Sequence, residues 1–399
     1  MFGNPEQMAQ AMRQFADMLS APQGSGPVNW DMAKNIARHA VVADGDPSVM
    51  EGERRQIVDA LNLADLWLNE ATELPSGVSN PQAWSRSEWI ENTVPVWQQL
   101  CEPIAERMVE TMGGALGGAG LPSEAQQMAG PLMGMLKQMG GMMVGQQIGQ
   151  ALGSLAREVI GTTDIGLPLS DRTALLPGGI ASFSDGLELP ADEIRLYLAL
   201  REAAHHRLFK HVPWLRSSLL GAVEEYAKGI TVDTSALEEQ IRELDINDPQ
   251  ALQEALSGGG ALLKPEETER QKAALARLET LLALVEGWVA TVVDDAAEGK
   301  LPSANALAET VRRRRATGGP AELTFGTLVG LELRPRRLRE AAALWDALKE
   351  GRGVDGRDGV WGHPDLMPTA EDLDDPEAFV RGEAAWDISQ LDQKPESDE

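Results

Sequence analysis

The sequence is poor in cysteine and lacks the basic excess of a nucleic-acid-binding protein. Cys101 is the one cysteine in 399 residues, which excludes an internal disulfide and fits a reducing compartment, so we expect the cytoplasm. Acidic residues outnumber lysine and arginine by 62 to 35, and the formal net charge at pH 7 is −27. Because nucleic-acid binding draws its affinity from a basic surface, DNA and RNA are not expected partners.

Several motifs are also absent. No G-x-S-x-G, P-loop or G-x-G-x-x-G element stands out, so neither a serine hydrolase nor a nucleotide-dependent enzyme is indicated. The first residues, MFGNPEQMAQAMRQF, lack a basic stretch followed by an apolar one, so no secretory signal is expected. Charged and amide side chains also interrupt every apolar run before it reaches the roughly 18 residues of a membrane span.

What the sequence does contain is helical periodicity. Strand signals are confined to short pieces around Thr173 to Phe183, so the expected fold is mostly α, a multi-helix architecture with a few short strands. Length alone predicts two or three domains. The expected segments are an N-terminal amphipathic helix and linker (1–25), a helical domain (28–111), Gly/Met-rich packing helices (112–160), a second helical domain (161–385) and an acidic disordered tail (386–399).

The Gly/Met-rich segment has glycines at every fourth position, namely Gly141, Gly145, Gly149 and Gly153. This spacing places them on one helix face, where a second backbone can approach closely. We therefore expect a buried, tightly packed helix pair preceded by a flexible Gly-rich loop. Membrane contact is the alternative, although Lys137 interrupts the segment and makes it the weaker one.

The helix expected over Leu196 to Lys210 carries a near match to the zinc-peptidase motif H-E-x-x-H. In that motif two histidines one turn apart hold Zn²⁺, and the glutamate acts on the bound water as general base. Glu202 and His205 stand at the positions of the glutamate and the second histidine. Arg201 stands at the position of the first histidine, and its guanidinium cannot ligate a metal.

Arg201 and His205 interrupt an otherwise apolar stripe of this helix, and Glu202 lies beside them. Buried charged groups need partners, so a carboxylate from another element is expected to meet them. His205 alone would most commonly be a satisfied core histidine. His206 and His211 fall on the more polar side, where we expect them to be solvated or hydrogen-bonded to the loop at Pro213.

A second helix, expected over Glu279 to Asp294, has one interior charge, Glu286, on an apolar stripe. A buried glutamate must be paired or coordinated. Two interpretations stay open: Glu286 is the third zinc ligand, or it forms a buried ion pair with Arg201 that fixes the helix register. Glu225, next to another glutamate, is a weaker candidate.

The chain resembles the type 2 zincin-like metallopeptidases over about residues 140–380. The stretches that carry the resemblance are LGSLAREVIGTTDIGLPL, REAAHHRLFKHVPWL, EGWVATVV, ETVRRRRATGGPAELTFGTLVGLELRPRRLREAAALW and GVWGHPDLMPTAEDLDDPEAF. The resemblance implies a zincin-like helical fold and zinc-dependent peptide hydrolysis, with Glu202 as base and His205 and Glu286 as metal ligands. A related branch has an intact H-E-x-x-H and an E-G-H, from which this chain departs at Arg201 and Trp288.

Two further clusters are weaker signals. Arginines run from Arg312 to Arg315 and recur at Arg334, Arg336, Arg337 and Arg339; in so acidic a chain we expect most of them to pair internally. His363, in a rigid Trp-Gly-His-Pro-Asp loop, is a candidate for lining the cleft, together with His206 and Trp288.

Three functions therefore stay open from the sequence. The first is a zinc metallopeptidase acting on a peptide or protein substrate. The second is a metal-free, inactive relative that binds a peptide or protein. The third, a membrane-associated scaffold, would use the Gly/Met-rich segment.

Overall fold

The computed structural model is mostly helical, as the sequence predicts, and describes residues 26–118, 123–228, 231–232, 265–266, 268–316 and 337–382. The helices are α2 (Trp30–Ala43), α3 (Glu51–Leu68), α4 (Arg86–Gly118), α5 (Ser123–Glu158), α6 (Pro177–Ser184), α7 (Ala191–His211), α8 (Pro213–Lys228), α11 (Glu269–Ala297), α12 (Ala304–Ala316), α14 (Leu338–Gly359) and α15 (Pro376–Arg381), with 3₁₀ turns η2 (Val360–Gly362) and η3 (Pro364–Leu366). The expected N-terminal helix, the C-terminal tail, Arg334 and Arg336 lie outside these residues.

Two strand pairs join distant segments. β1 (Gln82–Ala83) pairs in parallel with β2 (Ala174–Leu175), and β3 (Thr231–Val232) pairs antiparallel with β4 (Pro265–Glu266). The expectation of extended chain over Thr173 to Phe183 is correct only at β2. From Pro177 onward the segment is α6, because a proline has the φ angle of a first helical residue and needs no backbone N–H there.

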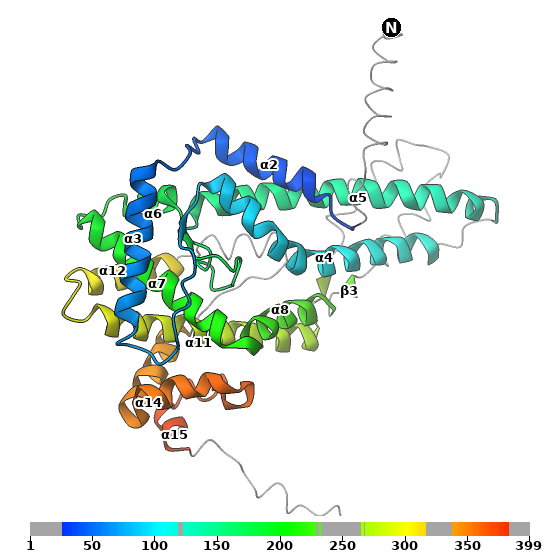
Figure 1. Cartoon of the computed structure of the whole chain (residues 1–399). Coiled ribbons are helices and arrows are strands. Elements are labelled where there is room, and N and C mark those ends of the chain that lie inside the picture. Colours follow the sequence, from blue (N-terminus) through cyan, green and yellow to red (C-terminus); the bar gives the residue numbers. More distant parts are fainter. Residues whose placement is uncertain are drawn as a thin grey trace, which may run out of the picture.

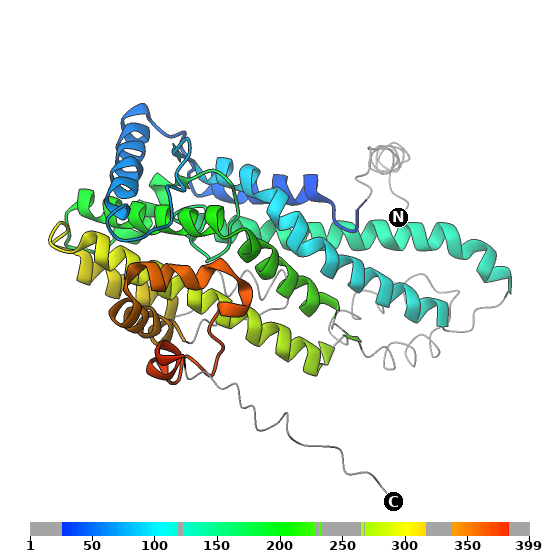
Figure 2. The same cartoon turned by 60° about the horizontal axis from the view of Figure 1, so that its bottom comes forward.

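The longest helices, α4 and α5, run side by side and extend past the ends of α8 and α11 (Figures 1 and 2). α2 packs along α5 at the glycine ladder, where a Cβ on Gly149 would lie 2.7 Å from the carbonyl oxygen of Ala33. Larger side chains could not fit there, which confirms the expected tight helix pair. The Gly-rich stretch expected to be a loop is helical as far as Gly118, where α4 ends, and residues 119–122 lie outside the described residues. Within the described part of the chain, no helix is both long and apolar enough to cross a membrane.

Side chains cap the starts of α2 and α11. Asn29 accepts a hydrogen bond from the backbone N–H of Met32 at the start of α2, and Thr268 forms a capping box with Gln271 at the start of α11. These bonds satisfy backbone donors that a helix leaves free in its first turn. Both caps fix helices that contribute to the core.

Buried side chains from α2 through α14 belong to one hydrophobic core, and the boundary expected between residues 111 and 112 lies inside α4. The two helices predicted to matter most lie within this core. The expected Leu196–Lys210 helix is part of α7, and the expected Glu279–Asp294 helix is part of α11. α7 packs against both α3 and α11, which places its interior charges between other elements.

Candidate functional site

Helix α7 is buried on every side along its middle. All residues from Tyr197 to Leu208 are buried, including five that carry charge or an imidazole, Arg201, Glu202, His205, His206 and Arg207. The expectation that His206 is solvated is therefore wrong: its side chain is 6 % exposed. A helix surrounded by neighbours has no polar face for solvent, so each of these groups needs a protein partner.

Glu286 of α11 is the partner of the charges on the α7 stripe. Its Oε2 accepts a hydrogen bond from Nη2 of Arg201 at 2.6 Å, and its Oε1 lies 2.9 Å from Nε2 of His205. Arg315, from α12, places its Nη2 2.8 Å from the same Oε1. This confirms the predicted meeting of Arg201 and His205 with Glu286, and adds a second guanidinium group.

The surrounding charges keep Glu286 ionised. Burial alone would raise the pKa of this carboxyl, but Arg315, His205 and Arg201 outweigh burial and hold the pKa well below its ordinary value of 4.5. Burial lowers the pKa of Arg201, and the Glu286 carboxylate more than restores it. The arrangement is a buried network in which one carboxylate contacts two guanidinium groups and one imidazole.

Glu202 has a different environment, formed by the loop of residues 159–173 between α5 and β2. Its Oε1 accepts from the backbone N–H of Thr162 at 2.9 Å and from the Thr162 hydroxyl. Its Oε2 accepts from the Thr163 hydroxyl at 2.7 Å and from the Thr163 N–H at 3.3 Å. Nε2 of His206 lies 3.3 Å from Oε1 and 2.9 Å from the Thr162 hydroxyl.

These bonds also stabilise a carboxylate. Burial raises the pKa of Glu202, but hydrogen bonding and charge from His206, followed by the two threonine hydroxyls, lower it below 4.5. The loop approaches so closely because Gly161 has no side chain: a Cβ there would collide with the Glu202 carboxylate. Both oxygens of the predicted general base are therefore occupied by groups of the protein.

The hydrogen bonds of His205 decide whether it can ligate a metal. Its Nδ1 lies 2.8 Å from the carbonyl oxygen of Arg201, an acceptor, so Nδ1 carries a proton. Its Nε2, the nitrogen left to ligate a metal, lies 2.9 Å from Oε1 of the Glu286 carboxylate. Both ring nitrogens therefore face groups of the protein.

The residues present therefore do not fit a zinc ion. A zincin site needs three protein ligands and an open position for water. Arg201 is a cation at the place of the first ligand, and both oxygens of Glu286 are bound to cationic side chains. Among the residues that the structure describes, no three His, Cys, Asp or Glu side chains are grouped so that they could hold a metal ion.

Trp288 and His363 lie apart from Glu286. Two positions along a helix turn a side chain through about 200°, so Trp288 points away from Glu286. Its Nε1 donates to Asp358 Oδ1 at 2.9 Å, and its ring meets Trp361 edge to face. The His363 side chain is 62 % exposed and lies beside Asp365.

The weaker candidates have ordinary partners. His211 is half-buried, and its Nε2 lies 3.0 Å from the carbonyl oxygen of Ser76 instead of contacting the loop at Pro213. Glu225 pairs with Arg270 and Lys228, in keeping with a solvated glutamate pair.

The arginine run is paired internally, as expected. Arg312 and Arg313 contact Glu309, Arg314 contacts Asp164, and Arg315 contacts Glu286. Sequence reasoning did not single out Arg315, or the loop threonines that hold Glu202. The signal was present, because the GTTD and VRRRR stretches both lie in segments that carry the family resemblance. Neither stretch has a periodicity that shows which carboxylate its side chains contact.

The comparisons with known proteins agree with this fold. A family model described as zincin-like metallopeptidase matches residues 28–380, nearly the whole chain. A solved structure from Chloroflexus aurantiacus, described as a "putative hydrolase with a novel fold", is similar with a TM-score of 0.63 and 22 % sequence identity. The similarity covers 90 % of this chain and 99 % of that one, and shows a shared fold. No curated protein matches the chain.

Proposed function

This chain belongs to the zincin-like metallopeptidase family, and we propose that it is a metal-free member that binds a peptide or protein without cleaving it. The observation that carries the proposal is the complete engagement of Glu286 by Arg201, Arg315 and His205. The groups that would hold zinc instead hold one another. They join α7, α11 and α12 into one buried unit.

Electrostatics supports the same conclusion. Around Glu286, two arginines and a histidine face one carboxylate, and the neighbouring Asp164 is itself paired with Arg314. A dication entering this region would be repelled by the guanidinium groups, and the low-dielectric interior strengthens that repulsion. Removing a guanidinium to admit the metal would leave it unpaired inside the protein, which is costly.

The proposed binding of a peptide or protein rests on membership of the family. A metallopeptidase acts on a peptide chain, and a relative that loses the metal can retain the surface that recognises the chain. The expected partner is therefore a peptide or a protein segment. We keep the cytoplasm as the proposed location because Cys101 is the one cysteine in the sequence.

An active zinc peptidase is the second candidate. Glu202 favours it, because its lowered pKa keeps it in the carboxylate form that a general base requires. Against it, each Glu202 oxygen accepts hydrogen bonds from the loop, so neither is directed at a substrate water. No observation favours the membrane-associated scaffold, because the glycine ladder is occupied by α2.

Cleavage and binding can be measured on the same protein. The full chain, supplied with zinc, is incubated with a mixture of fluorogenic peptides, and Glu202→Gln serves as the matched control. We expect no cleavage above the level of that variant, together with saturable binding of labelled peptides. Zinc-dependent cleavage that disappears in Glu202→Gln would overturn the proposal.

A further inference from the structure

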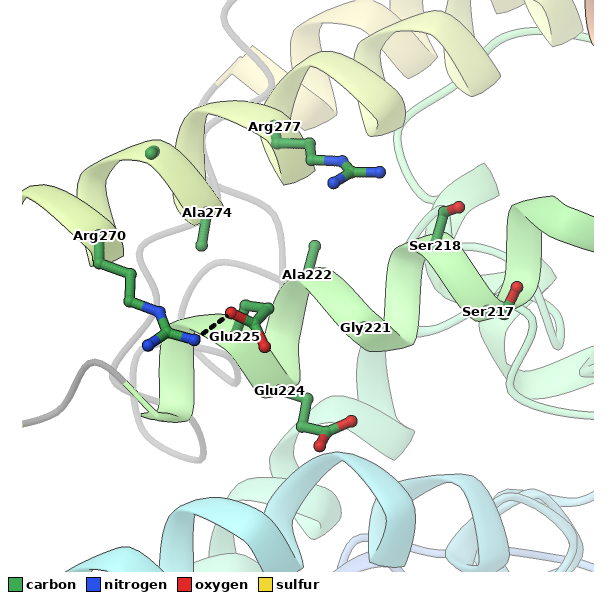
Figure 3. A pocket seen from close by; sticks show the side chains of 10 residues that line it. Ser217, Ser218, Gly221, Ala222, Glu224, Glu225, Arg270, Ala274 and Arg277 are labelled. Atoms are coloured by element: carbon green, nitrogen blue, oxygen red, sulfur yellow. Dashed lines mark hydrogen bonds and ion pairs between the residues drawn. The ribbon is translucent and has the colours of Figure 1, made fainter. Parts of the chain in front are cut away.

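A groove lies between α8 and the N-terminal part of α11 (Figure 3). Its volume is about 520 Å³, within the range of roughly 300–1,000 Å³ typical of small-ligand sites. Polar groups line its two ends. Its floor is formed by small residues, which are Gly221, Ala222, Ala273 and Ala274. The groove contains none of the residues of the Glu202 and Glu286 networks.

One end of the groove is neutralised by ion pairs within the protein. Glu225 Oε2 accepts from Nη2 of Arg270 at 2.5 Å, and Glu225 and Glu224 both contact Nζ of Lys228, at 3.1 and 2.9 Å. Each carboxylate at this end has at least one cationic partner. The pairs nonetheless leave carboxylate oxygens at the surface, since both side chains are about half exposed.

The other end presents hydrogen-bond donors that the protein does not use. Figure 3 shows Arg277 of α11 and Ser218 of α8 at this end, away from the Arg270–Glu225 pair. Within the described part of the chain, Arg277 has no carboxylate partner and Ser218 donates no side-chain hydrogen bond. In a protein with a net charge of −27, an exposed arginine without a carboxylate partner is a candidate anion site.

We propose that this groove binds the carboxyl-terminal end of a peptide, with the terminal carboxylate on Arg277 and Ser218. The assignment rests on the proposed peptide-binding function and gives it a location. A guanidinium presents two N–H groups in the geometry of a carboxylate. The single unpaired positive charge favours a monoanion, because the cations at the far end, Arg270 and Lys228, are already paired with carboxylates of the protein.

The rest of the groove suits a peptide backbone. Glu224 and Glu225 can accept hydrogen bonds from backbone N–H groups that precede the carboxylate. Gly221 leaves the floor open, because a Cβ at this position would meet nothing within 4 Å. That space is available to a side chain of the ligand.

Gly221 also supplies a clean steric probe. A leucine there would fill the groove without displacing protein atoms near its Cβ, and it raises helix propensity. Gly221→Leu should therefore fold. Gly52, on α3, is a helical glycine that likewise has nothing within 4 Å of an added Cβ, so Gly52→Leu is its matched control.

A second pair of variants tests the charge. Arg277→Gln removes the cation of the groove, and Arg339→Gln makes the same charge change at an exposed position of α14.

The test measures binding of fluorescein-labelled random tetrapeptides to the full chain by fluorescence anisotropy. One peptide mixture has free C-terminal carboxylates, and the other is amidated. We expect the free acids to bind at least about tenfold more tightly than the amides. Arg277→Gln and Gly221→Leu should abolish that preference, while Arg339→Gln and Gly52→Leu should keep it. Circular dichroism confirms that each variant is folded.

Other results would overturn the assignment. Equal binding of acids and amides, no binding of either, or a preference that persists in Arg277→Gln would contradict it. Displacement of the peptides by inorganic phosphate at equal concentration would show an anion site without peptide recognition. Peptide binding that is unchanged in both Arg277→Gln and Gly221→Leu would refute this location but leave the proposed function standing. Zinc-dependent cleavage would refute the proposed function itself.

Discussion

Glu202 and Glu286 are two buried carboxylates of one core, and they are stabilised in different ways. Glu202 is held by hydroxyl and backbone N–H groups of a loop together with one histidine. Glu286 is held by two arginines and a histidine from two other helices. In both cases the pKa lies below 4.5 although burial raises it. Hydrogen-bond donors achieve this at Glu202, and positive charges achieve it at Glu286.

The difference indicates which carboxylate is less suited to hold a metal ion. A carboxylate held by neutral donors leaves its surroundings without excess charge. A carboxylate that contacts two guanidinium groups has surroundings that repel a further cation. The Arg201 substitution in the zinc-peptidase motif therefore affects Glu286 more than its own neighbour Glu202, because Arg201 contacts Glu286 directly.

The largest effect is expected from Glu286→Gln. The amide leaves the Arg201 and Arg315 guanidinium groups buried without the Glu286 counter-charge, and breaking a buried ion pair from one side costs about 3–5 kcal/mol. Urea unfolding at neutral pH measures this loss. A loss below that of Glu202→Gln would contradict the distinction between the two carboxylates.

Acid should remove part of the same stabilisation. The folded-state pKa of Glu286 is below 4.5, so its contribution is fully present above that pH and is lost as pH falls through the lower folded value. We expect the free energy of unfolding to fall as pH drops below about 4.5, more steeply for the wild type than for Glu286→Gln. Parallel pH dependences of the two proteins would show that Glu286 is not held as described.

A smaller effect is expected from Glu202→Gln. The amide oxygen can still accept from Thr162, but the amide NH₂ faces the N–H of Thr163 and leaves that donor unsatisfied. One unsatisfied buried group costs about 1–3 kcal/mol. Urea unfolding measures it beside Glu286→Gln. If the two losses are equal, charge is not what separates the two sites.

The smallest effect is expected from Thr163→Val, which removes one hydroxyl donor to Glu202 and keeps the shape of the side chain. The expected loss is about 0.5–1.5 kcal/mol, the net value of a typical hydrogen bond. Thr280→Val makes the same chemical change on α11, where the hydroxyl donates to the carbonyl oxygen of Ala276 in its own helix, and is a suitable reference for unfolding measurements. A loss as large as that of Glu202→Gln would mean that this one hydroxyl carries the whole loop contact.

The helix pair and its main contact could be predicted from sequence because they follow from periodicity. Arg201, His205 and Glu286 stand on apolar stripes, and buried charge requires a partner, so their meeting was foreseeable. His206 was misplaced because its helix was read as having one polar side. α7 is covered all round, including by the loop whose Thr162 contacts His206.

The partners that loops and distant helices supply could not be foreseen in the same way. Thr162 and Thr163 lie in irregular chain, where no repeat indicates which way a side chain points. Arg315 is one of four consecutive arginines, and only the packing of α12 decides which of them reaches Glu286. The strand expected beyond Leu175 failed because Pro177 starts a helix there.

Zinc stoichiometry tests the central claim most directly. The purified wild-type chain is incubated with excess zinc and desalted, and its zinc content is measured by mass spectrometry, with Arg201→His treated in parallel. We predict a content far below one zinc per wild-type chain, because both oxygens of Glu286 and both nitrogens of His205 are engaged within the protein. One tightly held zinc per wild-type chain, lost on His205→Ala, would contradict the account.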